Sequence, residues 1–279
     1  MPDVAAAVAG AQARVKETRP LGPDALDLML EGETPLPVRD AALTALDGAA
    51  VDVCAQPWSG RRKRLLIADM DSTIIACEGL DELADYAGVK AEVAAVTEAA
   101  MRGELDFEAA LRARVARLEG LPVEVLARCY AERVRLNPGA RTLATTMAAA
   151  GACCVLVSGG FEAFAAPVAA QAGFHAHRAN VLLDDGARLT GRVAEPILGR
   201  DAKLAALREE AAAMGVGLEA TLAVGDGAND LAMIEAAGLG VAYRAKPIVA
   251  DLAAARVDHA DLTALLYFQG YAASEFVSG

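Results

Sequence analysis

The chain has 279 residues, of which 55% are apolar and 23% are charged, a composition typical of a globular protein rather than a disordered one. This length suits one large domain or a domain with an insert. The net charge of -12, from 26 basic and 38 acidic side chains, argues against a surface for nucleic acid or anionic membrane, so the expected partner is a small molecule.

The cysteine pattern indicates a reducing compartment. The five cysteines are odd in number, show no CxxC spacing and follow no recognisable secretory leader (Cys54, Cys77, Cys129, Cys153 and Cys154). No apolar run reaches the roughly 18 residues that a membrane span needs. We expect a soluble, cytoplasmic protein, either a monomer or a homodimer.

Residues 1–60 predict a small α/β appendage. A weak helix is expected over Val4–Lys16, a second helix over Pro37–Leu46 and a short strand over Ala50–Ala55. The basic run Arg61–Arg64 directly precedes an apolar strand, so we interpret it as a solvated strand entrance rather than a nucleic-acid site.

The apolar run Leu65–Ala68 predicts a buried parallel strand, and it leads directly into Asp69, Asp71 and Thr73. Open α/β sheets place their sites at such carboxyl ends. Carboxylates there can attack phosphorus, hold Mg²⁺ or transfer a proton to a leaving oxygen. From these residues alone, a solvated acidic turn is an equally good interpretation.

Residues 78–136 are helical in pattern and poor in strands. Apolar residues recur at helical spacing in two groups (Leu80, Leu83, Ala84 and Ala87; Phe107, Leu111, Val115 and Leu118). Nearly sixty helical residues are too many for a simple crossover, so we predict an inserted helical cap over 78–136 that closes on the site. The catalytic core then comprises 61–77 and 137–279.

A second strand ends in Ser158, Gly159 and Gly160, where backbone N–H groups and the next helix could hold a phosphoryl oxygen. A simple helix N-cap is the alternative function of Ser158. A hairpin is expected around Asp184–Gly186. His175 and His177 alternate along the chain before that hairpin, and without a third ligand nearby they are expected to be a polar surface pair rather than a metal site.

Lys203 lies in the expected first turn of a helix, and Thr221–Gly225 predicts a third strand that ends in Asp226. Asn229 and Asp230 begin the helix that follows. Acids meeting near Asp69 and Asp71 would form the oxygen-rich site that Mg²⁺ prefers. Residues 238–243 are expected to form the last core strand, with a further helix from about 245.

Together these features predict an α/β fold with a Rossmann-like core and a parallel central sheet. In their order and spacing, the motifs resemble the haloacid dehalogenase superfamily of phosphohydrolases (Asp69-x-Asp71-x-Thr73, Ser158, Lys203 and Gly225-Asp226-Gly227-x-x-Asp230). The resemblance covers residues 64 to about 265. It implies a helical cap inserted after the first core strand.

Within that superfamily the chain is similar to the phosphoserine phosphatase family. The matching details are Glu78, the cap sequence from Met101 through Phe107 to Arg114, and Val157–Phe161. Arg102 departs from the acid expected in many members. The resemblance implies Mg²⁺-dependent hydrolysis of O-phospho-L-serine to L-serine and phosphate, the last step of serine biosynthesis.

The resemblance also implies a role for each matching residue. Asp69 would be the nucleophile and Asp71 the general acid and base. Mg²⁺ would be held by the Asp69 carboxylate, the Asp71 carbonyl and Asp226. The remaining implied roles are phosphoryl binding by Ser158, Gly159, Gly160 and Lys203; orientation of lysine, metal and water by Asn229 and Asp230; and serine binding by Glu78, Arg114, Phe107 and Met101.

Two alternatives stay open. One is a phosphatase or phosphotransferase of the same superfamily that acts on another small molecule. The other is a non-catalytic phosphoacceptor similar to a receiver domain, which also uses a strand-end Asp, a hydroxyl and a Lys, but which is about half this length and has no cap.

Overall fold

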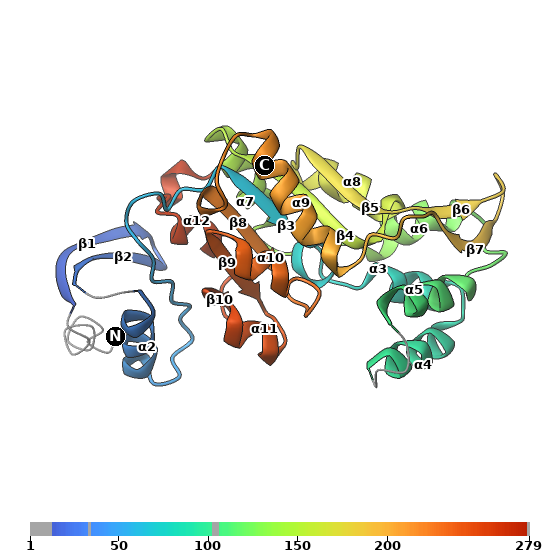
Figure 1. The fold of residues 1–279 in the computed structure, drawn as a ribbon, viewed down its shortest axis with the longest axis horizontal. Helices are drawn as coiled ribbons and strands as arrows, with labels where there is room; N and C mark the ends of the chain where they lie inside the picture. The colour runs from blue at the N-terminus through green and yellow to red at the C-terminus, as the bar shows by residue number, and fades with distance from the viewer. Residues whose placement is uncertain (1–12, 33–34, 102–105, 278–279) are drawn as a thin grey trace.

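The computed structural model describes residues 13–32, 35–101 and 106–277. A six-stranded parallel sheet lies at its centre, with an N-terminal segment at one end and a helical cap at the other (Figure 1). The strands lie in the order β10-β9-β8-β3-β4-β5. Their bounds are β3 Leu65–Ala68, β4 Cys153–Phe161, β5 Ala176–Asn180, β8 Thr221–Gly225, β9 Leu239–Tyr243 and β10 Ala255–Val257.

Strand β3 is central and completely buried, because it pairs in parallel with β4 on one side and with β8 on the other. Alternate side chains of these strands enter two different cores. Leu66 belongs to one buried cluster, whereas Leu65 and Ile67 belong to the other, and each cluster includes apolar residues of flanking helices. Helices therefore cover both faces of the sheet, as the apolar strands require.

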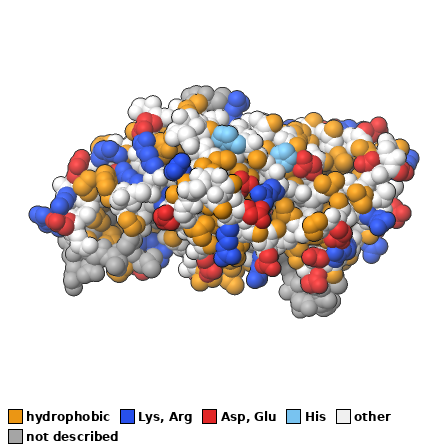
Figure 2. Space-filling view, turned by 45° about the horizontal axis from the view of Figure 1, so that its top comes forward, with side chains coloured by type: hydrophobic (Ala, Val, Ile, Leu, Met, Phe, Trp, Pro, Cys, Tyr) orange, Lys and Arg blue, Asp and Glu red, His pale blue; other side chains and the backbone are white. Residues whose placement is uncertain are grey.

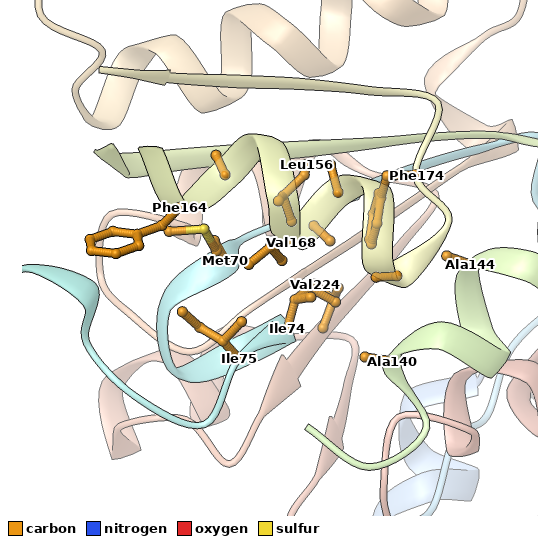
Figure 3. Close-up of a cluster of buried hydrophobic side chains, with 14 of the residues drawn as sticks. Met70, Ile74, Ile75, Ala140, Ala144, Leu156, Phe164, Val168, Phe174 and Val224 are labelled. Atoms are coloured by element: carbon orange, nitrogen blue, oxygen red, sulfur yellow. The ribbon is translucent and has the colours of Figure 1, made fainter. Parts of the chain in front are cut away.

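The flanking helices are short and rich in alanine. Their bounds are α7 Ala140–Ala149, α8 Glu162–Ala172, α9 Arg200–Ala213, α10 Leu231–Ala236, α11 Pro247–Leu252 and α12 Ala264–Phe268, with single turns η2 Leu218–Ala220 and η3 Ala273–Glu275. Figure 3 shows the core against α7 and α8, where Phe164, Val168 and Phe174 surround Met70 and Leu156. This packing buries the segment that follows β3.

The chain leaves β3 through the turn η1 (Met70–Ile74) and then forms four helices. Their bounds are α3 Gly79–Tyr86, α4 Lys90–Met101, α5 Phe107–Ala116 and α6 Glu124–Arg133. A hairpin of β6 (Leu182–Asp184) and β7 (Leu189–Val193) extends from the core along these helices (Figure 1). The hairpin predicted around Asp184–Gly186 is thus present, and it joins the cap through Gly120 N–H to the Leu189 carbonyl and Leu189 N–H to the Leu121 carbonyl, each at 2.8 Å.

The N-terminal segment forms an antiparallel pair, β1 (Arg14–Gly22) and β2 (Ala25–Glu31), followed by helix α2 (Pro35–Leu46). It lies against the β10 edge of the core, where Asp52 accepts hydrogen bonds from the backbone N–H groups of 258, 259 and 260. A hollow of about 270 Å³ lies between α2 and that edge. Two charged residues of its lining, Arg256 and Asp258, pair with each other at 3.1 Å.

Three local predictions were wrong. The end of the predicted Val4–Lys16 helix lies in strand β1, and residues 4–12 lie outside the described part of the chain. Residues 50–55 form no strand and pair with no strand among the described residues. Strand β9 is not the last of the core, because β10 adds in parallel beyond it.

The surface carries charged side chains of both signs, as the composition predicts. Acidic and basic side chains are interspersed over the face shown in Figure 2, and histidines lie at that surface. His177 Nε2 lies 2.7 Å from Glu162 Oε1, and His175 Nδ1 accepts from the Cys154 N–H, so the two histidines have separate partners. Within the described ranges, no helix is long and apolar enough to cross a membrane.

Candidate active site

The carboxyl ends of neighbouring parallel strands bring the predicted polar residues together. Asp69 follows β3, Ser158 lies near the end of β4, and Asp226 follows β8. Lys203 reaches the same edge from the first turn of α9. Strand β4 continues through Gly160 to Phe161, so α8 begins later than the Ser-Gly-Gly pattern predicts.

A buried lysine lies between two buried acids. Lys203 Nζ is 2.5 Å from Asp69 Oδ1 and 2.6 Å from Asp230 Oδ1, and these side chains are 1%, 7% and 0% exposed. Burial acts to lower the pKa of Lys203, but Asp69 and Asp230 outweigh it and raise that pKa above its usual value. Lys203 is therefore a fixed cation beside Asp69.

Three acids form a cluster around this edge. Asp69, Asp226 and Asp230 each offer a carboxylate oxygen, and these oxygens lie within 4.8 Å of one another. Burial and the nearby Asp230 raise the pKa of Asp226 to about 6, and burial also raises the pKa of Asp69 against the effect of Lys203. Asp230 Oδ2 accepts the Gly227 N–H at 3.0 Å, and Thr73 Oγ1 donates to Asp226 Oδ1 at 3.3 Å.

Asp71 is held in a defined orientation. Its Oδ1 accepts the Gly79 N–H at 2.8 Å, and its Oδ2 accepts the Ser158 hydroxyl at 3.2 Å. Burial, assisted by the negative charge of Glu78, raises the pKa of Asp71 to about 7. A carboxyl group with that pKa can give and take a proton near neutral pH.

The turn between Asp71 and the cap is strained. Ser72 has a φ of +55°, in the left-handed region that a residue with a Cβ rarely adopts. Its N–H donates to the Cys77 carbonyl at 3.1 Å and its hydroxyl donates to Glu78 Oε1 at 2.6 Å. These bonds hold Glu78, an exposed residue directly before α3, beside the entrance of the site.

The cap places two further predicted residues near the strand ends. Phe107 begins α5 and is 37% exposed, and its ring lies beside Gly159 and Gly199 of the core. Arg114 is half-buried; burial lowers its pKa, while the nearby acids Asp81, Glu78 and Asp71 act in the opposite direction. The Met101 side chain and Arg102 lie outside the described part of the structure.

Asn229 is half-buried and lies beside this cluster. Its side chain covers Gly227, because a Cβ added to Gly227 would lie 2.2 Å from Asn229 Oδ1. Sequence reasoning missed Asn180, which ends β5 at the same edge of the sheet and is 3% exposed. A signal was available, because Asn180 is a single polar residue between Ala179 and Val181 at another strand end.

Comparison with known proteins agrees with this architecture. A family model for haloacid dehalogenase-like hydrolases matches residues 66–235, which is more than half of the chain. The chain belongs to this family, and both the predicted superfamily and the α/β fold class are confirmed.

Relatives within the family are phosphoserine phosphatases. One from Streptomyces coelicolor is 45% identical over 253 residues, a match that covers 90% of this chain but 62% of that protein. Another, from Streptococcus thermophilus, is 46% identical over 200 residues and covers 72% of this chain and 93% of that protein. The chain therefore spans less than two thirds of the Streptomyces relative.

Solved structures show the same likeness. A probable phosphoserine phosphatase from Vibrio cholerae, in unliganded form, superposes with a TM-score of 0.80 at 32% identity, covering 99% of this chain and 85% of that one. A substrate-bound phosphoserine phosphatase complex superposes with a TM-score of 0.68 at 37% identity, covering 74% and 98%.

Proposed function

We propose that the chain hydrolyses O-phospho-L-serine to L-serine and phosphate through an aspartyl-phosphate on Asp69. The main support is the arrangement of two acids of different character: Asp69 Oδ1 is held by Lys203 at 2.5 Å, and Asp71 has a pKa raised to about 7. This difference supports Asp69 as the nucleophile and Asp71 as the proton donor. The phosphoserine phosphatase relatives supply the substrate class.

In the first step, Asp69 attacks phosphorus and the bond from phosphorus to the serine oxygen breaks. Lys203 lies 2.5 Å from Asp69 Oδ1 and would hold the carboxylate in position for this attack. Asp71 gives its proton to the departing serine oxygen, which leaves as the hydroxyl of L-serine. The Ser158 hydroxyl, the glycine N–H groups beside it and Lys203 would hold the phosphoryl oxygens.

In the second step, water attacks phosphorus and the bond to Asp69 breaks. Asp71, now ionised, takes the proton from that water and returns to its starting form. Inorganic phosphate leaves and Asp69 is again a carboxylate. The cap, which lies over Gly159 through Phe107, would keep other water away from the intermediate.

The acid cluster fits a divalent cation of the Mg²⁺ type. Three buried or half-buried carboxylates have oxygens within 4.8 Å of one another, and two of them, Asp69 and Asp230, pair with Lys203. Oxygen ligands are those that Mg²⁺ prefers. Asp69, Asp226 and the Asp71 carbonyl would hold the ion, which when bound offsets the negative charge of the phosphate.

Serine itself would be recognised by charges of both signs. Glu78 would bind the ammonium group and Arg114 the carboxylate, since guanidinium and carboxylate can pair through two hydrogen bonds. Phe107, together with Met101, would form the apolar side of the pocket. This pairing favours an amino acid over a sugar phosphate.

The first test is steady-state phosphate release from O-phospho-L-serine, phosphothreonine and a sugar phosphate, each with Mg²⁺ and with EDTA. The proposal requires a Mg²⁺-dependent preference for phosphoserine. Equal turnover of all three would keep the chemistry and reject the substrate. No turnover of any of them would favour a non-catalytic phosphoacceptor.

Arg114→Ala tests the recognition of serine. Loss of a charge-assisted hydrogen bond costs roughly 1.5–3 kcal/mol, or about 10- to 100-fold. We expect KM for phosphoserine to rise by that factor and KM for p-nitrophenyl phosphate to change little. Arg117→Ala, at the exposed end of the same helix, is the control. An equal loss on both esters would remove Arg114 from serine recognition.

A further inference from the structure

Asn180 makes a buried bridge between two segments of the site. Its Nδ2 donates to the Gly159 carbonyl at 2.9 Å and to the Leu198 carbonyl at 3.2 Å, and its Oδ1 accepts the Leu198 N–H at 2.7 Å. The side chain is 3% exposed. One amide therefore uses both of its N–H groups and its oxygen on backbone groups.

The first partner of Asn180 controls the orientation of Ser158. The Gly159 carbonyl and the Gly160 N–H belong to one planar peptide group and point in opposite directions. Asn180 holds the carbonyl, while the Gly160 N–H donates to Ser158 Oγ at 2.8 Å. Ser158 Oγ in turn donates to Asp71 Oδ2 at 3.2 Å. Rotation of this peptide would thus move the hydroxyl.

The second partner of Asn180 lies at the entrance to α9. Leu198 precedes that helix by one residue, Gly199, and Lys203 lies in its first turn. Between Asn180 and Leu198 the chain forms the β6–β7 hairpin, which bonds to the cap at Gly120 and Leu121. The chain therefore leaves the core for the hairpin at Asn180 and returns at Leu198, and the Asn180 side chain joins these two points.

We propose that Asn180 is a positioning residue of this active site: it fixes the Gly159–Gly160 peptide, and with it Ser158, relative to the helix that carries Lys203. Asn180 touches neither substrate nor reacting atoms, and acts through these two groups. The proposal rests on the proposed function for its kinetic consequences, and on the hydrogen bonds above for its geometry.

Asn180→Asp is the informative variant. It keeps the acceptor for the Leu198 N–H, but it places an oxygen against the Gly159 and Leu198 carbonyls. Loss of a hydrogen bond that orients a site residue from behind costs about 10- to 100-fold in activity. We expect kcat/KM to fall by that factor for phosphoserine and p-nitrophenyl phosphate alike, because both share the phosphoryl group. The ratio between the two esters should stay within about threefold of the starting protein.

Gln269→Glu is the matched control. Gln269 is also fully buried and bonds to backbone groups: it donates to the Leu265 carbonyl and accepts the Lys63 N–H. Because Lys63 precedes β3, this bond lies at the end of β3 opposite to the site. Both variants should lower the thermal midpoint. Only Asn180→Asp should lower the activity of the folded protein. If Asn180→Asp does not fold, Asn180→Ser takes its place.

A purely structural role would leave kcat/KM of folded Asn180→Asp within twofold of the unchanged chain, and that result would overturn the proposal. If the unchanged chain hydrolyses neither ester, the proposed function fails, and calorimetric binding of inorganic phosphate with Mg²⁺ decides this point instead. Binding at least tenfold weaker in Asn180→Asp, and unchanged in Gln269→Glu, supports the positioning role. Equal binding, or no phosphate binding by the unchanged chain, overturns it.

Discussion

Burial gives Asp71 its chemical character. The Asp71 side chain is half-buried, and this burial, with the negative charge of Glu78, raises its pKa to about 7 even though the Gly79 N–H favours the charged form. Asp71 must first donate a proton, so it can act in the first step only while it is protonated. With a pKa of about 7, Asp71 stays largely protonated up to neutral pH. The same group with an ordinary pKa near 4 would be ionised at neutral pH.

The pH dependence of turnover should show this ionisation. As pH rises through about 7, Asp71 loses the proton that the serine oxygen needs, so kcat/KM for phosphoserine should fall. p-Nitrophenolate leaves without a proton, so the fall should be weaker for p-nitrophenyl phosphate. The measurement is kcat/KM for both esters from pH 5 to 9. Identical alkaline limbs for the two esters would contradict this role of Asp71.

The strand-end residues of the candidate site could be located from the sequence, because Asp69 and Asp226 directly follow apolar strands and Ser158 follows the apolar run within β4. The pairing of parallel strands then brings Asp69, Ser158 and Asp226 to one edge of the sheet, regardless of the conformation of the connecting loops. The signal for Asn180 is weaker, because β5 also carries His177 and Arg178 and is not an apolar run. The proposed role of Asn180 depends on the Gly159 carbonyl and on Leu198, and neither backbone partner leaves a mark in the sequence.

The junction between core and cap depends on one glycine. Gly79 begins α3, and its N–H donates to Asp71 Oδ1. A Cβ at this position would lie 3.0 Å from Phe164 Cδ2 and 3.2 Å from Asp71 Oδ1. Since Phe164 is fully buried, there is little room for a larger residue.

Gly79→Ala should therefore destabilise the protein and slow it. Overpacking of a core costs typically about 1–3 kcal/mol, and the displaced N–H would release Asp71. Urea unfolding and kcat measure the two effects. Phe164→Leu should relieve part of the crowding, so the double variant should be more stable than the sum of the single changes. Strict additivity would refute the steric explanation.

The wrong predictions for the N-terminal segment have a physical cause. Residues 50–55 have strand-like composition, but a strand needs a neighbouring strand with which to pair. This stretch instead attaches to the core by the side chain of Asp52, and the following Gln56 donates to the Phe268 carbonyl. The local sequence pattern does not predict whether such a stretch finds a pairing partner.

At the scale of the whole molecule, the acids gathered at the carboxyl edge of the sheet outnumber the cations beside them among the described residues. Asp69, Asp226 and Asp230 face one buried cation, Lys203, and burial raises the pKa of both Asp69 and Asp226. Ionised carboxylates in this setting reduce stability, and a divalent cation bound to their oxygens would reverse that effect. The folded state should therefore bind Mg²⁺ more tightly than the unfolded chain does.

Thermal unfolding should show this coupling. A ligand at 100 times its Kd stabilises the folded state by about 2.7 kcal/mol, so Tm should rise with Mg²⁺ concentration. Asp226→Asn should remove most of the rise. Asp251→Asn, an exposed acid on α11, is the control and should keep it. The same rise in Tm for Asp226→Asn would place the cation elsewhere.

In the proposed mechanism, Asp69 carries the phosphoryl group during turnover. Acid quenching of the chain during turnover of ³²P-labelled phosphoserine, followed by peptide mapping of the label, tests this step. We expect label on Asp69, and neither label nor phosphate release in Asp69→Asn. Label on another residue, or normal turnover by Asp69→Asn, would contradict it.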